Sequence, residues 1–390
     1  MKTYASARRE IENGRAKDVY FDELLKRVPG HFKVEARNTP RFHRQGRTAL
    51  FPSHMDAALI ETTAGILAKL RRPPAVKRAA AELTSCLAAL FPTMGPMGER
   101  VAQTLARFYW ERRVCLWLLR RLKPSAVWVA DNGEWALLAA AREAGVPVFE
   151  FQHGVVDDGH PNALSAACAV WKSVIPRPHR LLVYGTHWKE ALQKAGFYDQ
   201  EIIVTGSVLV DSYRNRAARR LRESGPGRVV VLTTQGVDRE PLMRWMERFM
   251  ELVREKGPVR LFIKTHPSYE TDTAAYRARF RGDPRVTVVG GNEEPATLDL
   301  IARADWHISI SSTCHYDALG LGVPTVVLGL TTHDVVDVLR IRGHAAFASS
   351  AEELAERVVG APPPPVPGGV SEAYFRPGAL EATLNAVGLS

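Results

Sequence analysis

The sequence has few cysteines: there are four, and no two of them form a Cys-x-x-Cys pair. Their wide spacing argues against a disulfide scaffold or a zinc knuckle and is typical of a reducing compartment. No uncharged apolar run reaches the roughly 18 residues that a membrane-spanning helix needs. The first twenty residues lack the apolar core of a secretory signal. We therefore expect a cytoplasmic protein.

Two common nucleotide-binding motifs are also missing. There is no G-x-x-x-x-G-K-[ST] loop, which cradles phosphates in P-loop proteins, and no G-x-G-x-x-G fingerprint of dinucleotide-binding folds. P-loop nucleotide hydrolysis and dinucleotide redox chemistry therefore lose their usual sequence support. An Asp-x-Asp motif is absent as well.

The composition is that of a globular protein: 390 residues, 46% hydrophobic and 24% charged, enough for two domains. The formal net charge of +10 is concentrated in one half. Residues 1–200 hold 30 Lys and Arg against 19 Asp and Glu, whereas residues 201–390 hold 22 against 23. This distribution predicts an anionic partner for the first half, namely nucleic acid, acidic lipid or an acidic glycan. The alternative is a set of Arg-rich helices that are simply exposed to water.

The pattern of apolar residues divides the chain. Three long helical patterns cover about 53–71, 75–91 and 97–122. The third is rich in Arg and Trp, which is typical either of a core helix with solvated Arg residues or of a helix on a membrane surface. From residue 126 the pattern alternates strand and helix, which is typical of βαβ units in a parallel sheet.

The sequence thus predicts an α/β protein with two Rossmann-like, doubly wound parallel-sheet domains and a helical N-terminal extension. The carboxyl ends of the two sheets should face a cleft, where ligands of such folds bind. A linker is expected because residues 211–228 carry six Arg, two Gly and one Pro. The expected parts are an N-terminal acceptor-binding domain at 1–210 (helical 1–122, Rossmann-like 123–210), a linker at 211–227, a C-terminal nucleotide-sugar-binding domain at 228–362, and a Pro-rich spacer with a C-terminal helix at 363–390.

A polar segment follows the strand expected at 146–151, where open α/β sheets build their sites. His153 should project from the sheet edge, and Asp157 or Asp158 is a candidate general base for an acceptor hydroxyl. A polar turn with a structural histidine is the alternative. The candidate acceptor-binding residues are Gln152, Gly154 and His160.

A second polar segment ends the strand expected at 259–264. Pro267 stops the strand and keeps His266 at the sheet edge. His266 can protonate or hydrogen-bond a departing phosphate oxygen, and Lys264 can offset its charge. This pair therefore predicts a contact with a phosphate leaving group.

Two further strand ends complete the set. Ser311, Ser312 and Thr313 open a helix that contains Asp317, and hydroxyls at a helix N-terminus serve as caps, as anion ligands or as both. After the first strand of the second domain, Thr234, Gln235 and Gly236 form a candidate nest for a diphosphate or a sugar. The candidate base or ribose contacts are Asn292 and Glu294.

The succession FEFQHG, LLVYGTHWKEALQKAGF, IIVTGSVLVD, IKTHP and ISSTCHYDALGLGVPTVVLG resembles bacterial glycosyltransferases of the GT-B fold that build capsules and lipopolysaccharides. The similarity covers roughly residues 126–330. It is most similar to CMP-sugar enzymes, the sialyltransferases and Kdo transferases, and to the CDP-glycerol glycerophosphotransferases of teichoic acid synthesis.

The resemblance assigns roles to short motifs. In sialyltransferases of this fold an acidic-acidic-glycine motif holds the base, a His-Pro motif assists the leaving CMP, and a Ser-Ser motif binds its phosphate. Asp157-Asp158-Gly159, His266-Pro267 and Ser311-Ser312 occur here in that order. The QHG turn before the aspartates is closer to the glycerophosphotransferase and Kdo-transferase pattern, in which the histidine itself is important. The base is therefore His153 or an aspartate, and the donor nucleotide stays open between CMP, CDP and UDP.

The resemblance implies a metal-independent glycosyltransferase without a cofactor. Its donor would be a nucleotide-sugar, with a CMP-linked sugar such as sialic acid or Kdo favoured, and its acceptor an anionic glycan or a lipid-linked acceptor. We expect peripheral contact with acidic membrane on the inner face, and no nucleic acid partner. The alternatives are a CDP-glycerol-type phosphotransferase, a UDP-sugar 2-epimerase on the same fold, and a non-catalytic basic protein that binds glycan or nucleic acid.

Overall fold

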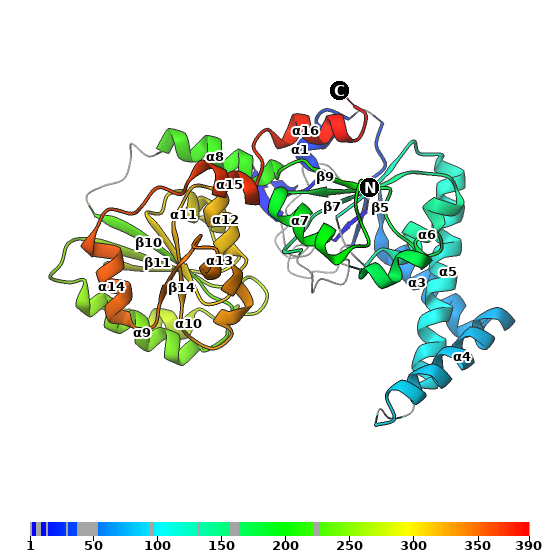
Figure 1. Ribbon diagram of the computed structural model, residues 1–390, viewed down its shortest axis with the longest axis horizontal. Coiled ribbons are helices and arrows are strands. Elements are labelled where there is room, and N and C mark those ends of the chain that lie inside the picture. The colour runs from blue at the N-terminus through cyan, green and yellow to red at the C-terminus, as the bar shows by residue number, and fades with distance from the viewer. Residues whose placement is uncertain are drawn as a thin grey trace. The chain divides into compact units, whose positions relative to one another are not determined.

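The chain forms two compact units (Figure 1). The computed structural model describes residues 2–4, 9–12, 15–28, 30–36, 54–93, 95, 97–130, 133–156, 164–220 and 227–389. The first unit comprises Met1–Leu182, Ala191–Ile203 and Ala386–Ser390, and the second comprises Val183–Glu190 and Val204–Asn385. Each unit is built on a parallel sheet with helices, so the predicted α/β class with two Rossmann-like domains is confirmed.

The first sheet starts earlier in the chain than the sequence pattern indicated. Its seven strands, in spatial order, are β5 (Met55–Asp56), β4 (Val34–Ala36), β1 (Lys2–Tyr4), β6 (Val127–Val129), β7 (Val148–Phe151), β8 (Arg180–Val183) and β9 (Ile202–Val204). The expectation that residues 1–122 are helical is therefore wrong: this range also holds the antiparallel pair β2 (Arg9–Glu12) and β3 (Arg15–Asp18). Three strands of the first sheet, β1, β4 and β5, lie in it as well. These strands are two or three residues long, and the segment around β4 holds buried charges such as Lys33 and Glu35. Neither feature produces the apolar run by which a buried parallel strand is recognised.

The three long helices of the first unit are confirmed, as α3 (Ala57–Leu70), α4 (Pro74–Leu90) and α5 (Gly98–Leu122). Asp56 caps α3 by accepting the N–H of Ala58, and α4 begins with a proline at its first turn, where the missing N–H costs nothing. The C-terminal half of α5 packs its apolar stripe on the sheet core. In Figure 1, α4 and the N-terminal half of α5 extend beyond that sheet.

The second sheet has six parallel strands. Their order is β12 (Val286–Val289), β11 (Val259–Lys264), β10 (Arg228–Thr233), β13 (Trp306–Ser309), β14 (Thr325–Leu328) and β15 (Ala346–Ala348). The three strands β10, β13 and β14 are almost continuously buried, because helices cover both faces of the sheet. Helices α9 (Arg239–Leu252) and α14 (Ala351–Gly360) pack on one core, while α11 (Thr297–Ala302) and α12 (Cys314–Gly320) contribute to the other.

The expected linker and C-terminal spacer differ from the structure. Helix α8 (Val208–Arg220) occupies most of the linker at 211–227. The segment after 363 forms α15 (Gly368–Tyr374) and α16 (Ala379–Ala386), and Tyr374 is fully buried. Its carbonyl accepts a hydrogen bond of 2.8 Å from the Trp188 indole, so α15 is an integral part of the second unit.

Candidate active site

Polar loops gather at the carboxyl edge of the second sheet, after the neighbouring strands β11, β10 and β13. The N–H of Thr234 donates to the carbonyl of Lys264 (3.0 Å), and the Ser309 hydroxyl donates to the carbonyl of Thr233 (2.6 Å). Three loops therefore start side by side. They carry the predicted residues Thr234, His266 and Ser311.

The buried carboxylate of Glu270 joins two of these loops. It accepts hydrogen bonds from the Thr234 hydroxyl, the N–H of Gly236 (3.0 Å), Nε of Arg239 (2.8 Å) and the Tyr276 hydroxyl (3.1 Å). Its partnership with Arg239 raises the pKa of that guanidinium. Sequence reasoning missed Glu270, although it lies three residues after the His266-Pro267 motif, because a single acidic residue in a polar loop gives no signal of its own. The four donors fix the backbone of the loop after β10 relative to the loop after β11.

Position 236 requires glycine. Its φ of 76° lies in the left-handed region, and a Cβ there would come within 3.0 Å of the Tyr269 carbonyl oxygen. The predicted nest residue is thus placed against the loop that follows β11.

His266 is held in one tautomer. Its Nδ1 accepts the backbone N–H groups of Ser268 and Tyr269, each at 3.0 Å, and its ring stacks on the Tyr269 ring with centroids 4.4 Å apart. Because Nδ1 is an acceptor, the neutral ring carries its hydrogen on Nε2. The backbone N–H groups of Ser268 and Tyr269 therefore fix the ring orientation of this half-buried histidine.

Lys264 does not have the surroundings that the sequence predicted for it. Its buried ammonium donates to the carbonyls of Gly290 (2.8 Å), Glu293 (2.5 Å) and Pro295 (2.9 Å). Burial lowers the pKa of Lys264 to about 8. An ammonium has three hydrogens, so this lysine fastens the loop after β12 and has no donor left for a phosphate, contrary to the sequence prediction.

The loop after β12 lies against the His-Pro turn. A Cβ on Gly291 would lie 2.4 Å from the nitrogen of Pro267, so only glycine allows this approach. The side-chain amide of Asn292 donates to the Pro267 carbonyl (3.4 Å), whereas Glu294 is exposed. Asn292 is thereby brought to the edge that carries His266.

Ser311 joins the loop after β13 to its neighbours. Its hydroxyl donates to Oε1 of Gln235 (2.9 Å) and lies 3.1 Å from the Thr332 hydroxyl. Sequence reasoning missed Thr332, which follows β14. The predicted residues Thr234, Gln235 and Gly236 are therefore brought together with Ser311.

Ser312, Thr313 and Asp317 have separate environments. The buried Ser312 hydroxyl accepts the N–H of Cys314, the first residue of α12 (3.2 Å), and the phosphate contact expected for Ser312 stays a prediction. Thr313 is exposed, and Asp317 is half-buried one turn into α12.

Two histidines are buried inside the second unit. Nε2 of His307 lies 2.9 Å from the Thr233 hydroxyl, and the Thr325 hydroxyl lies 2.8 Å from Nδ1 of His307 and 2.6 Å from Nδ1 of His315. Burial lowers the pKa of His315 to about 4 and that of His307 well below its usual value. Both rings are therefore neutral near pH 7 and act as structural links beneath the edge.

In the first unit, Gln152, His153 and Gly154 follow β7 as predicted. The Gln152 amide donates to the carbonyl of Gly154 (2.7 Å), and the Tyr20 hydroxyl donates to the carbonyl of His153 (3.1 Å). Tyr20 gave no sequence signal. The candidate residues Asp157, Asp158 and His160 lie outside the described residues. The choice between His153 and an aspartate as base thus stays a prediction.

Two negative findings concern the described part of the chain. It contains no group of three or more His, Cys, Asp or Glu side chains arranged to hold a metal ion. None of its helices is both long enough and apolar enough to cross a membrane.

The comparisons with known proteins identify the fold. No protein-family model matches the sequence, and no curated protein matches it either. Among solved structures, the UDP-GlcNAc 2-epimerase from Methanocaldococcus jannaschii in complex with UDP-GlcNAc and UDP is similar with a TM-score of 0.51 and 11% identity, over 94% of this chain and 93% of that chain. A variant of the wall teichoic acid polymerase TagF soaked with CDPG gives 0.50 and 10%, over 100% and 87%.

At these identities the likeness shows the fold alone. The chain has the GT-B fold of these enzymes, as the sequence resemblance implied. The finer resemblance to CMP-sugar and Kdo enzymes stays a prediction.

Proposed function

We propose that the protein is a glycosyltransferase that moves a sugar from a nucleotide-activated donor to an anionic glycan or a lipid-linked acceptor. The single observation that carries the proposal is the fixed tautomer of His266 at a sheet edge that also gathers Thr234, Gln235 and Ser311. A donor phosphate needs directed hydrogen-bond donors, and we assign this role to the Nε2–H of His266 and to the guanidinium of Arg239, because the Thr234 and Ser311 hydroxyls already donate to Glu270 and Gln235.

In the proposed reaction the acceptor oxygen forms a bond to the anomeric carbon of the donor sugar. The bond between that carbon and the phosphate oxygen breaks, and the nucleotide leaves with the electron pair. The acceptor proton passes to a base, His153 or one of the aspartates at 157 and 158. His266 donates its Nε2–H to the departing phosphate oxygen, where negative charge develops.

Arg239 takes the role that the sequence had assigned to Lys264. Glu270 holds Nε of Arg239, while 37% of the arginine side chain stays exposed. A guanidinium fixed through one nitrogen offers its others to an anion with little loss of side-chain entropy. Arg239 is therefore the cation that we propose for the donor phosphate.

The donor and the acceptor are assigned to different units. The donor, with a CMP-linked sugar favoured, belongs to the second unit, and the acceptor to the first, which carries the excess positive charge. The reaction as proposed needs no metal ion or cofactor and takes place on the cytoplasmic side of the inner membrane.

The test is a thermal-shift panel of CMP, CDP, UDP, GDP and ADP. A ligand that binds only the native state raises the melting temperature, and about 2.7 kcal/mol of stabilisation is expected at a hundred times the dissociation constant. Arg239→Ala should lose the shift, whereas Arg244→Ala, an exposed arginine on the same helix, should keep it. If no nucleotide shifts the wild-type protein, the proposal is wrong. A steep salt dependence of duplex DNA binding would then favour the non-catalytic alternative.

A second candidate is a UDP-sugar 2-epimerase, and the fold likeness to the archaeal epimerase is the observation that favours it. An epimerase needs no acceptor. Product formed from a UDP-sugar alone, without added glycan or lipid, would identify this activity and exclude transfer as the main reaction. A phosphotransferase that uses CDP-glycerol would instead respond to CDP in the panel.

A further inference from the structure

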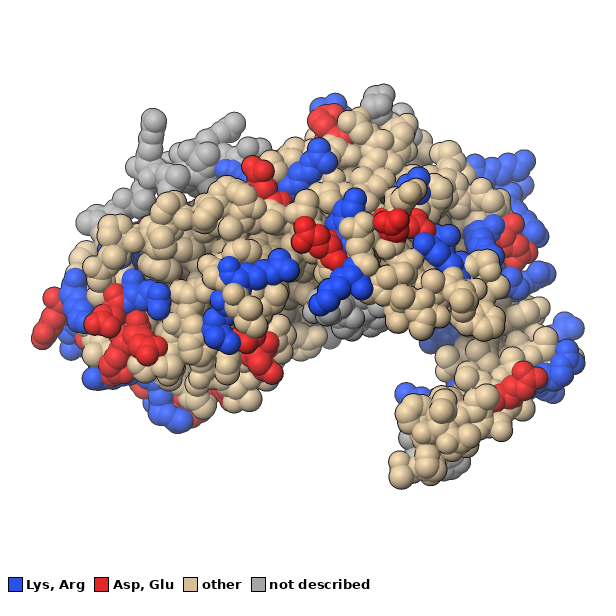
Figure 2. Space-filling view, in the orientation of Figure 1, with Lys and Arg blue, Asp and Glu red and all other residues tan. Residues whose placement is uncertain are grey.

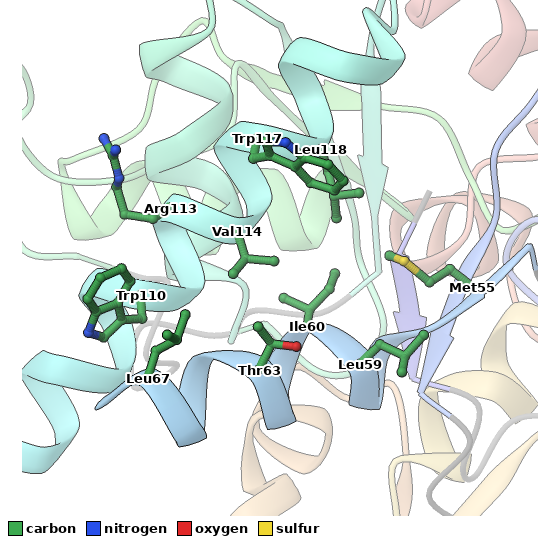
Figure 3. Close-up of a pocket in the computed structure, with 10 residues that line it drawn as sticks. All are labelled: Met55, Leu59, Ile60, Thr63, Leu67, Trp110, Arg113, Val114, Trp117 and Leu118. Carbon is green, nitrogen blue, oxygen red and sulfur yellow. The ribbon is translucent and has the colours of Figure 1, made fainter. Parts of the chain in front are cut away.

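Helices α3 and α5 of the first unit enclose an apolar groove with a volume of about 390 Å³. Figure 3 shows side chains from the two helices facing each other, with Trp110 near one end and Met55 near the other. The volume is in the range of small-molecule sites. The Trp110 indole donates its only hydrogen to the carbonyl of Arg71 (2.8 Å), so its ring presents no unsatisfied polar group.

The rim of this groove exposes large apolar side chains. Of the residues that line it, Trp117 is 64% exposed and Leu59 61%. Of the fifteen large hydrophobic side chains that are exposed in the described residues, eight lie between 59 and 122. They are Leu59, Ile66, Leu70, Leu83, Leu90, Phe91, Trp117 and Leu122. Such a concentration in one helical layer marks an interaction surface.

The same layer carries a large net positive charge. Residues 57–123 hold 12 Lys and Arg against 4 Glu and no Asp, a balance of +8 within a chain whose net charge is +10. In Figure 2 basic side chains lie along the outer edge of the region of α4 and α5, with acidic ones beside them, while much of the visible surface there is uncharged. Arg113 and Arg121 flank Trp117 one helical turn away on either side, and within the described residues neither forms an ion pair.

We infer that α3 and α5 form a docking surface for an anionic lipid bilayer, and that the groove between them takes a lipid acyl chain. A cationic helix face with exposed Trp and Leu lies in the plane of a bilayer interface, where the rings enter the acyl boundary and the arginines meet headgroup phosphates. In Figure 3 the Arg113 guanidinium points away from the groove. This inference goes beyond the proposed transfer reaction and does not depend on the donor site.

The experiment is co-sedimentation of the full chain with vesicles of phosphatidylcholine alone and of phosphatidylcholine with equal phosphatidylglycerol. We expect at least about tenfold stronger binding to the anionic vesicles, and a loss at high salt. Trp117→Ala should weaken binding about fivefold or more, and the double variant Arg113→Glu/Arg121→Glu about tenfold or more. The matched controls are Trp171→Ala, 62% exposed outside the groove, and Lys256→Glu, which should bind like wild type.

The groove itself is tested with acyl chains that carry bromine, which quenches nearby tryptophan fluorescence. Quenching in the wild-type protein should fall in Trp110→Phe/Trp117→Phe and remain in Trp171→Phe. Equal binding to neutral and anionic vesicles, or unchanged binding by both charge and Trp117 variants, would overturn the inference. A dimer that Trp117→Ala makes monomeric, without vesicle binding, would assign the groove to a second copy of the chain. Nucleotide shifts should be the same in all these variants, so failure here is distinguishable from failure of the donor site.

Discussion

Two regions of the molecule differ in how their side chains are paired. They are the carboxyl edge of the second sheet and the helical layer α3–α5 of the first unit. At the sheet edge, Glu270, His266 and Ser311 have protein partners at hydrogen-bond distance. In the helical layer, Trp117 and Leu59 are open to solvent, and Arg113 forms no ion pair among the described residues.

The difference indicates two kinds of ligand. Directed hydrogen bonds between fixed loops suit one small ligand of defined shape, because their geometry is set before binding. Exposed arginines around apolar side chains suit the broad surface of a lipid bilayer, to which each single contact contributes little binding energy. Substitutions at the sheet edge should therefore change nucleotide binding and leave vesicle binding intact, and the reverse should hold for the helical layer.

The largest expected effect belongs to His266. His266→Ala should reduce turnover at least about a hundredfold, because the donor to the leaving phosphate is lost. His266→Asn keeps an acceptor at the position of Nδ1 and should be as poor as alanine. His266→Gln places an amide N–H near the position of Nε2 and should recover part of the activity. Turnover is compared among variants whose melting temperatures equal that of the wild type. Near-wild-type turnover of the alanine variant would reject the proposed role of His266 as donor to the leaving phosphate.

Substitution of Glu270 should have the second largest effect. Glu270→Ala leaves Thr234, Gly236, Arg239 and Tyr276 without their shared acceptor, and the free energy of unfolding should fall by about 2–4 kcal/mol. Urea unfolding measures this loss, and the nucleotide thermal shift should decrease with it. Glu352→Ala removes an exposed ion pair with Arg248 and should change neither quantity. A stable Glu270→Ala protein with unchanged nucleotide binding would show that the carboxylate does not organise the edge.

The buried histidine pair predicts a dependence on pH. The pKa of His315 is lowered from 6.5 to about 4, so the unfolded chain binds more protons between these values. Its neutral form therefore contributes full stability above about pH 6.5, and this stability is lost as the pH falls towards 4. His315→Asn retains a partner for Thr325 and should show a shallower loss between pH 7 and 5 in urea unfolding. Parallel curves for the two proteins would contradict the assignment.

Ser311 should have the smallest effect. Ser311→Ala removes a neutral hydrogen bond of about 0.5–1.5 kcal/mol, which corresponds to a roughly threefold to tenfold loss of nucleotide affinity. Ser312→Ala should instead lower the melting temperature, since it removes the buried hydroxyl that accepts the N–H of Cys314, and leave the affinity unchanged. Titration calorimetry distinguishes the two. An affinity loss confined to Ser312→Ala would reverse their roles.

The sequence predicted the second sheet better than the first for a physical reason. Strands such as β10 are buried on both faces and read as unbroken Val and Leu runs. The segment around β4 instead contains Lys33, which forms a buried ion pair with Asp22 at 2.6 Å. A pattern based on hydrophobicity cannot recognise elements whose buried side chains are charged.

The sequence predicted the site residues that directly follow strands, and it missed those that lie further along the loops. Thr234, His266 and Ser311 stand directly after strands, so their position at one edge follows from the parallel order. Glu270 and Thr332 reach the edge from loops, and only the fold of those loops brings them there. For the same reason the sequence assigned Lys264 to a phosphate, although the loop after β12 supplies its three acceptors.

The second unit is discontinuous, and its last helices close over segments from much earlier in the chain. Gly185 lies so close to the Ala373 carbonyl that no Cβ fits, and Asp211 accepts the N–H of Ala379. During synthesis the ribosome therefore makes strands β10 to β15 before the residues that cover Trp188 exist. The nascent second unit therefore stays partly uncovered until α15 and α16 have emerged from the ribosome.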